Sequence, residues 1–398
     1  MREQFAYPGR AGMVPSSKNE ERPAAQLIAC LYFGFVLTGI GTTLLGCILP
    51  ALSGIWNLND SHSGFLIAAQ FAGSSCGALL ARSRLYTTLI RGYLLLAVSA
   101  VSIAFCHGYF AAPLLFCFGL GLGSAMTSTS MIIAGIYSAT RGASLSLLNA
   151  FWGLGAVLCP PLVTAWEHFH SSPSLYLGMA VTAMLPLILL ALHHTCCLTQ
   201  LPDDSGPSYS LRARVSLLVP LGLFAFLYVG VETSISSWMM TYIHRLPLSS
   251  AMYAPIATSF FWIALLCGRA AAPAVLRKIS ESRLLTISLS VLLVSNIMLL
   301  LSYTSVMSLT SAALAGLMLA PIFPLCLSRV LAITSRPSES RWIFAISGLG
   351  GAVLPWMTGQ LATARGSLRT GLVVPLLASC VMFFLHLRTN SLPERGEI

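Results

Sequence analysis

The feature that most constrains this chain is a series of long apolar stretches that recurs from Gln26 to Leu387. Each is about 20 residues long, which lets a helix cross the roughly 30 Å hydrocarbon core of a bilayer. The stretches are continuously apolar rather than alternating, which predicts helices and disfavours a barrel. Charged residues make up 9% of the chain, against about 25% in a soluble domain. The sequence therefore predicts an all-α membrane protein.

Twelve transmembrane helices are predicted from these stretches. They cover residues 26–52, 63–81, 87–106, 111–137, 143–166, 174–193, 215–242, 250–272, 284–302, 305–333, 342–364 and 370–387. A polar segment rich in Pro, Gly and Ser separates six helices from six and has the composition of a linker. The predicted organisation is an N-tail at 1–25, a six-helix bundle at 26–193, a linker at 194–214, a second bundle at 215–387 and a C-tail at 388–398.

The basic residues set the predicted orientation. With the N-terminus inside, 18 of the 22 Lys and Arg residues fall in cytoplasmic segments and three fall outside, namely Arg245, Arg365 and Arg369. The positive-inside rule then places both termini and the linker in the cytoplasm, in a bacterial inner (plasma) membrane. The net charge of +10 is assigned to this asymmetry, because no basic patch interleaved with exposed aromatics suggests nucleic-acid binding. The first 25 residues are polar and charged, so no cleavable signal peptide is expected.

An internal repeat supports two six-helix pseudo-repeats. Gly-Leu-Gly at 153–155 recurs at 348–350, an offset of 195 residues. At the same offset Pro160 matches Pro355, Arg141 matches Arg336 and Gly121 matches Gly316. Parallel six-helix repeats about an axis along the membrane normal are a transporter architecture. The alternative is a set of independent helices with ordinary small-residue packing.

One acidic residue, Glu232, is the strongest candidate for a functional group. Of twelve acidic residues it alone lies well inside an apolar stretch, and an ionisable group in the membrane is costly and usually functional. Tyr228 and Ser236 lie four residues to either side on the same helical face and are expected to hydrogen-bond it. The functional interpretation is a sugar-hydroxyl acceptor or a proton or cation site. The alternative is a structural carboxyl bonded to a neighbouring helix.

Amides and tryptophans inside the apolar stretches are the other candidates. Gln70, Asn149 and Gln360 are expected either to join helices or to bind a polar ligand. Four tryptophans also lie within stretches: Trp152, Trp238, Trp262 and Trp356. A tryptophan beside an amide, as in Asn149-Ala-Phe-Trp152, suits a sugar, because the ring covers the apolar face of a pyranose while the amide bonds its hydroxyls. Arg329, near the cytoplasmic end of its stretch, is interpreted as snorkelling or as a gate.

Enzymatic chemistry is not expected. The sequence has no Gly-x-Ser-x-Gly, no Walker loop and no His-Glu-x-x-His, and uphill movement would have to use an ion gradient. His193-His-Thr-Cys-Cys197 lacks the spacing and the second cluster of a metal site, so no metal is expected. Most cysteines lie in apolar stretches and are interpreted as packing residues.

Several segments resemble the major facilitator superfamily, and within it the fucose/galactose/glucose–proton symporter branch. The resemblance is carried by Tyr228-Val-Gly-Val-Glu232 with Trp238 and Tyr242, by Leu148-Asn149-Ala-Phe-Trp152-Gly-Leu-Gly155, by Ala68-Ala-Gln70-Phe-Ala-Gly73, and by Gly119-Leu-Gly121-Leu-Gly123. It implies the major facilitator fold over about residues 25–387. The loop motifs of that family are matched by Arg82 and Arg84 and by Gly268 and Arg269. The branch places a carboxylate in helix one and another in helix four. In this sequence the first predicted helix has no carboxylate. Met126 and Ser130 occupy the positions of the motif in the fourth predicted helix.

The sequence thus predicts an alternating-access carrier of a small neutral hydroxylated solute, with a monosaccharide preferred. The candidate binding or coupling residues are Gln70, Asn149, Trp152, Tyr228, Glu232, Ser236, Trp238, Trp356 and Gln360, with Arg82, Arg84, Gly268 and Arg269 as gating residues. The expected partners are the solute and the lipid bilayer, without nucleic acid and without a cofactor other than a coupling proton or sodium ion, and a monomer is expected. Two alternatives stay open: a proton-driven exporter of drug-like or amphipathic molecules, and a non-transporting membrane sensor or assembly partner.

Overall fold

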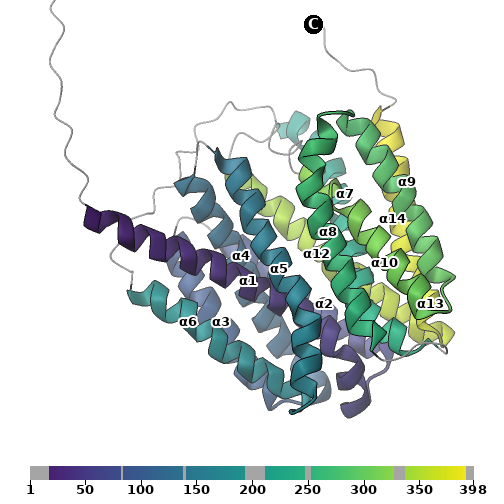
Figure 1. The fold of residues 1–398 in the computed structure, drawn as a ribbon, viewed down its shortest axis with the longest axis horizontal. Helices are drawn as coiled ribbons and strands as arrows, with labels where there is room; N and C mark the ends of the chain where they lie inside the picture. The colour runs from purple at the N-terminus through teal and green to yellow at the C-terminus, as the bar shows by residue number, and fades with distance from the viewer. Residues whose placement is uncertain are drawn as a thin grey trace, which may run out of the picture.

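The computed structural model describes residues 18–81, 84–137, 140–192, 211–246, 252–326 and 337–390, and these residues are almost entirely helical (Figure 1). The long helices are α1 (Lys18–Ile55), α2 (Asp60–Leu80), α3 (Leu85–Ala104), α4 (Ala111–Ile136), α5 (Arg141–Glu167), α6 (Leu175–Leu192), α7 (Leu211–His244), α8 (Tyr253–Leu276), α9 (Glu281–Leu300), α10 (Ser305–Leu319), α12 (Pro337–Arg365) and α14 (Val373–Asn390). Among the described residues, ten helices are long and apolar enough to cross a membrane. The prediction of an all-α membrane protein is confirmed.

Every predicted helix has a counterpart, but the ends differ. The helix α1 begins at Lys18, inside the predicted N-tail, and α7 begins at Leu211, inside the predicted linker. The predictions followed apolar residues, whereas a helix satisfies its own backbone hydrogen bonds and continues past the hydrocarbon boundary. The predicted end of the eighth helix at 272 is likewise too early, because α8 continues to Leu276. The end of the tenth predicted helix beyond residue 326 lies outside the described residues.

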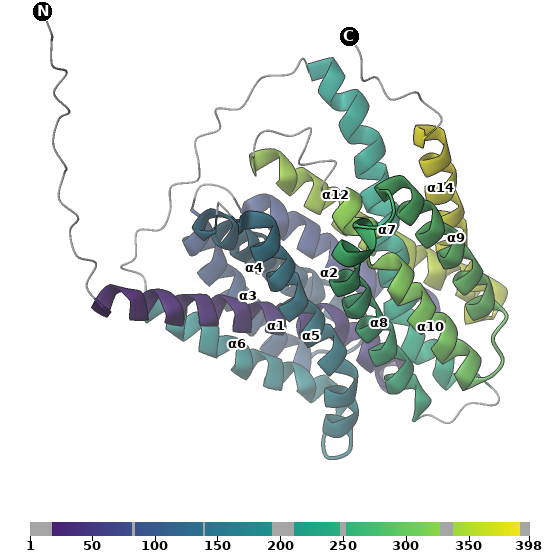
Figure 2. The same ribbon diagram turned by 45° about the horizontal axis from the view of Figure 1, so that its top comes forward.

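The helices form two groups. Within 18–192, α1 packs on α5 and α6, and α4 packs on α2 and α3; within 211–390, α7 packs on α12 and α14, and α10 packs on α8 and α9. We call these groups the N-half and the C-half. They meet along three helix pairs, α2 with α12, α5 with α8, and α1 with α7. Figures 1 and 2 show the halves side by side.

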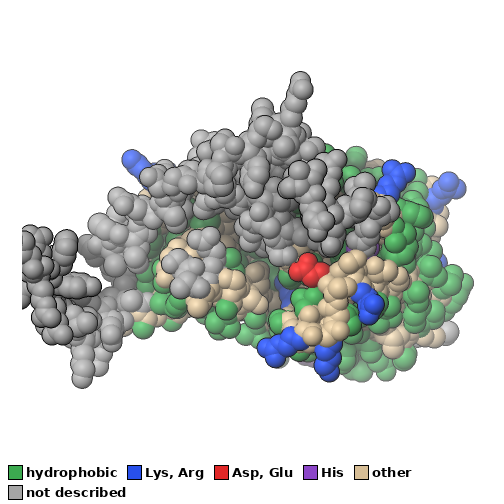
Figure 3. All heavy atoms as spheres, turned by 90° about the horizontal axis from the view of Figure 1, so that it is seen from above, with side chains coloured by type: hydrophobic (Ala, Val, Ile, Leu, Met, Phe, Trp, Pro, Cys, Tyr) green, Lys and Arg blue, Asp and Glu red, His purple; other side chains and the backbone are tan. Residues whose placement is uncertain are grey.

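The structure has two distinct faces. The start of α1 and the end of α14 lie toward one face, which we call the terminal face (upper left and upper right in Figure 1). The opposite face carries the end of α1 with the start of α2, and the end of α7 with the start of α8. Figure 3 looks onto the terminal face, where Lys and Arg side chains are more prominent than Asp and Glu.

Two glycines of the predicted repeat make equivalent contacts. A Cβ at Gly155 of α5 would collide with the Val36 carbonyl oxygen of α1, and a Cβ at Gly350 of α12 would collide with the Phe226 carbonyl oxygen of α7. Each half therefore packs its fifth helix tightly on its first. Gly121 and Gly316, also related by the repeat, do not make equivalent contacts. A Cβ at Gly121 would meet the backbone of α3, whereas one at Gly316 would meet the backbone of α8.

The replacement Gly123→Ala is expected to lower the melting temperature by several degrees. A Cβ there would collide with the Ser74 carbonyl oxygen of α2, and close backbone approach at small residues is what holds membrane helices together. Gly135→Ala, on the same helix with nothing within 4 Å of its Cβ, is the control and should be neutral or slightly stabilising, because alanine favours helix by up to about 1 kcal/mol. Thermal unfolding in detergent checks both. Equal melting temperatures for the two variants would contradict the tight α2–α4 contact.

The halves close on each other at the opposite face. Arg245, at the end of α7, makes two hydrogen bonds of 2.8 Å to the carboxylate of Asp60, the first residue of α2. The backbone N–H of Ser61 donates to Oγ1 of Thr363 in α12 at 2.7 Å. Deeper in, a Cβ on Gly46 of α1 would lie 2.7 Å from Cα of Ser237 in α7. The structure is therefore in a state in which the opposite face is closed.

Candidate functional site

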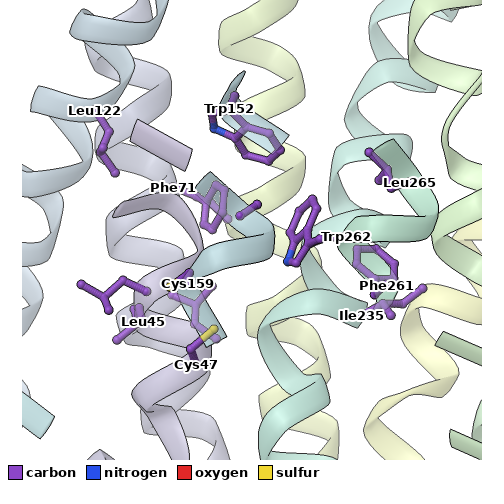
Figure 4. Close-up of a cluster of buried hydrophobic side chains, with 14 of the residues drawn as sticks. Leu45, Cys47, Phe71, Leu122, Trp152, Cys159, Ile235, Phe261, Trp262 and Leu265 are labelled. Atoms are coloured by element: carbon purple, nitrogen blue, oxygen red, sulfur yellow. The ribbon is translucent and has the colours of Figure 1, made fainter. Parts of the chain in front are cut away.

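Two tryptophans meet across the halves near the middle of their helices. Trp152 of α5 and Trp262 of α8 have ring centroids 5.3 Å apart and an interplanar angle of 80°. Both belong to the cluster of buried side chains in Figure 4, which also includes Phe71 of α2. Both indole rings are buried, and neither indole Nε1 has a hydrogen-bond partner. Buried polar groups normally find a partner, so these two donors are available to a ligand at the interface.

A buried amide from α2 lies at similar depth. The Nε2 of Gln70 donates to the carbonyl oxygens of Gly41 at 3.3 Å and Thr42 at 3.2 Å, which fixes the side chain against α1. Its Oε1 is buried and has no partner. Gln70 thus joins α2 to α1 through its Nε2 and keeps an acceptor, Oε1, without a partner.

An ion pair links α7 to α8. The carboxylate Oε2 of Glu232 lies 3.8 Å from Nη2 of Arg269, and both side chains are largely buried. The same Nη2 lies 3.4 Å from the hydroxyl of Tyr228, which also interacts with Glu232. The ring of Tyr228 stacks on Phe323, with centroids 5.4 Å apart. Glu232, Arg269 and Tyr228 therefore form one cluster, which we call the charged cluster.

The antiparallel course of α7 and α8 explains how residues at different depths meet. Side chains of a helix tilt toward its N-terminus. Glu232 on α7 therefore leans toward the terminal face, and Arg269 on α8 leans away from it. Tyr228 lies one turn from Glu232 on the side of the terminal face, between the two charges. Arg269 lies inside α8, as the predicted helix 250–272 places it, seven residues before the end at Leu276. Its count among the cytoplasmic loop charges is not matched, because its side chain is largely buried.

Other candidates on α7 have packing partners within the protein. Ser236 donates to the Thr233 carbonyl oxygen at 3.4 Å, a bond within its own helix, and no hydrogen bond from Ser236 to Glu232 is formed. Trp238 is fully buried, and its Nε1 donates to the Pro355 carbonyl oxygen at 3.0 Å. Tyr242 bonds the Leu299 carbonyl oxygen at 3.0 Å. These contacts fix α7 against α9 and α12, so Trp238 and Tyr242 are in structural rather than ligand-binding positions.

Several predicted residues lie away from the charged cluster and the tryptophan pair. Asn149 is exposed and its Nδ2 donates to the Leu145 carbonyl oxygen of its own helix at 2.9 Å. Trp356 and Gln360 line a pocket of about 460 Å³ together with residues of α12 and α14 only. Arg84 is exposed at the start of α3, and Gly268 packs on α10. Arg82 and Arg329 lie outside the described residues.

The sequence did not reveal the partners of Trp152 and Glu232. Trp262 was recognised as an intramembrane tryptophan but not as the residue opposite Trp152. Arg269 was recognised only through its loop motif. The sequence did contain a signal for Arg269. A buried carboxylate such as Glu232 needs a counter-charge, and Arg269 is a basic residue inside the predicted helix that follows the helix of Glu232. No comparable signal in the sequence points to the tryptophan contact.

Two six-helix halves, a buried polar layer between them and one closed face define a membrane carrier. The sequence profile of the Major Facilitator Superfamily matches residues 31–341, and the chain belongs to that superfamily. It is 26% identical to the glucose/mannose transporter of Bacillus subtilis (strain 168), over 82% of this chain and 86% of that protein. It is 23% identical to the glucose/galactose transporter of Brucella abortus, over 89% and 91%. In fold it is similar to the xylose transporter XylE from E. coli, with a TM-score of 0.73, 16% identity and coverage of 93% and 99%.

Proposed function

We propose that this protein carries a monosaccharide across the membrane by alternating access between its two halves. The observation that carries the proposal is the tryptophan pair, Trp152 and Trp262, which joins the halves at mid-depth and holds two buried indole N–H groups without partners. A carrier that rocks its halves around a fixed midplane site must place its ligand at such an interface. The pair is positioned to contact solute from both halves.

The chemistry of this layer suits a sugar. An aromatic ring covers the apolar C–H face of a pyranose, and polar groups at its edge bond the hydroxyls, which is how apolar pockets with a few polar groups gain specificity. Here the indole N–H groups donate, and Oε1 of Gln70 accepts. The names of the Bacillus and Brucella relatives, a glucose/mannose and a glucose/galactose transporter, support the same solute class.

The proposed orientation places the terminal face in the cytoplasm. On the terminal face, the turn after α8 and the first turn of α9 carry Arg277, Lys278 and Arg283 against one acid, Glu281. Positive residues are retained on the cytoplasmic side. The closed opposite face would then be the outer face, and the structure would represent a state closed to the outside.

Trp262→Leu is expected to raise the KM for sugar counterflow about tenfold or more. The replacement keeps an apolar side chain but removes the ring and its free N–H, and one lost stacking and hydrogen-bonding group is worth about 1–3 kcal/mol. Purified protein in liposomes preloaded with unlabelled glucose, galactose or mannose is tested for counterflow of the labelled sugar.

The matched control is Trp342→Leu, since Trp342 is 54% exposed near the terminal end of α12. It should leave KM unchanged. Absence of counterflow for all three sugars in the unmodified protein would overturn the proposed substrate class. An equal rise of KM in both variants would remove the tryptophan pair from the site.

A further inference from the structure

Within the part of the chain that the structure describes, the charged cluster holds the carboxylate, Glu232, to which a coupling proton would have to bind. The other acids whose side chains the structure describes are Asp60, Glu167 and Glu281, and each is the first or last residue of its helix. In the sequence, Asp60 and Glu167 are the only acids between residues 26 and 193. The helical interior of the N-half therefore supplies no carboxylate. A proton symporter needs a group that takes up and releases a proton during the cycle, and intramembrane acids usually do this.

We propose that Arg269 is the permanent counter-charge of Glu232, so that the carrier moves its solute down the solute's own gradient and is not driven by protons. This inference rests on the proposed transport function. The 3.8 Å approach of Nη2 to Oε2 makes the pair neutral as a whole without a proton. A buried charge without a partner is costly, whereas a paired one is tolerated. Loading and unloading of a proton at Glu232 would have to separate this pair.

The position of the pair within one half keeps it together through the cycle. Glu232 and Arg269 lie on α7 and α8, which pack on each other inside the C-half. Alternating access is largely a rigid-body movement of one half against the other. The distance between Oε2 and Nη2 is therefore conserved in both end states. The ion pair of Asp60 with Arg245 joins α2 to α7 across the halves, and the movement that opens the opposite face separates it.

The other groups around α7 do not supply an alternative proton site to Glu232. On α7 and α8 the interacting groups are Tyr228 and Arg269. From α1, Cys47 is buried beside the contact of Gly46 with Ser237. From α14, His386 lies 2.9 Å from Oγ1 of Thr286 at the start of α9. Between residues 305 and 326, which include α10, the ionisable group is Cys326, which contacts the Leu221 carbonyl oxygen three turns from Glu232. In α12 the side chains of Glu339 and Arg341 lie outside the described residues.

The test separates transport from coupling in the same liposomes. Counterflow of labelled glucose, galactose or mannose measures transport, and accumulation under an imposed gradient measures coupling. An inward gradient of about one pH unit would sustain about tenfold accumulation if one proton moved with each sugar, because tenfold corresponds to about 1.4 kcal/mol. We expect counterflow with an accumulation ratio of about one, under both a proton and a sodium gradient.

Arg269→Gln is expected to make transport depend on protons. With its counter-charge removed, Glu232 is neutral only when it binds a proton, so counterflow should become dependent on pH by about tenfold per unit, or a proton gradient should now drive accumulation. The double variant Glu232→Gln with Arg269→Gln restores a neutral pair and should return counterflow to pH independence.

The outcomes are distinguishable. Counterflow in the unmodified protein together with accumulation driven by protons or sodium would overturn the inference and leave the proposed function standing. Absence of counterflow would overturn both. If Arg269→Gln reduces the amount of folded protein, the unmodified protein still decides the question, since its accumulation ratio needs no variant.

Discussion

Gly46→Phe is expected to abolish transport while the protein stays folded. Gly46 lies on α1 in the half of the helix nearer the opposite face, where its would-be Cβ is 2.7 Å from Cα of Ser237 in α7. A phenyl ring at this position occupies the space that the C-half fills in the closed state. Packed interiors do not absorb an added side chain of this size, and overpacking costs several kcal/mol. The halves are then held apart at the opposite face, and the rate of counterflow should fall by about a hundredfold or more.

The folded state is expected to survive because the wedge lies between the halves and each half keeps its own helix contacts. Gly54→Phe is the control: it is on the same helix and has nothing within 4 Å of its Cβ, so transport should be near normal. Melting temperature and counterflow are measured for both variants. Normal transport by Gly46→Phe would mean that α1 and α7 need not approach each other at this point during the cycle.

The fold was predictable because a bilayer permits few architectures. A continuous apolar stretch of about 20 residues can only be a helix there, so the number and order of the helices follow from the sequence. Helix ends were less predictable. The residues before Gln26 and before Val215 include charged ones, such as Glu21 and Arg214, yet α1 and α7 continue through them, because a helix needs no apolar side chains once it has left the hydrocarbon.

The charged cluster was half predictable. Glu232 stands out in the sequence because an acid in an apolar stretch is rare, whereas Arg269 lies at the edge of its stretch and has the appearance of an orientation charge. The two are brought together by the antiparallel packing of α7 and α8 and by the opposite tilt of their side chains. Chain order gives the antiparallel course, but the rotation of each helix about its axis, which decides whether the side chains meet, follows from tertiary packing.

The direction in which a side chain faces was the least predictable feature. In a soluble helix the apolar stripe marks the interior, whereas in a membrane both the lipid-facing and the protein-facing surfaces are apolar. Gln70 was therefore indistinguishable from Gln360 in the sequence, although the structure buries the first against α1 and exposes the second on α12. For the same reason, the sequence does not distinguish Trp262, which is buried, from Trp356, which is half-exposed.

Reversing one charge of the ion pair at the opposite face is expected to open that face. Asp60 and Arg245 form a bidentate pair between α2 and α7, with side chains 11% and 44% exposed. An exposed pair of this kind contributes up to about 1 kcal/mol, and Asp60→Arg replaces that attraction with repulsion between two arginines. The closed state should therefore lose about fivefold in population relative to the open state.

The reporter for this change is a single cysteine introduced as Ser237→Cys in a background without the native cysteines. Ser237 is 8% exposed where it meets Gly46, so a membrane-impermeant thiol reagent added to the opposite face reaches it only when that face opens. Labelling should be about fivefold faster with Asp60→Arg and should return toward the original rate when Arg245→Asp is added, because the double reversal restores the attraction. Added salt should weaken the effect of the single reversal, since exposed charges are screened over about 10 Å at 0.1 M. If the single and double reversals label equally fast, the pair does not hold the face closed, and the contacts around Gly46 and Thr363 alone account for closure.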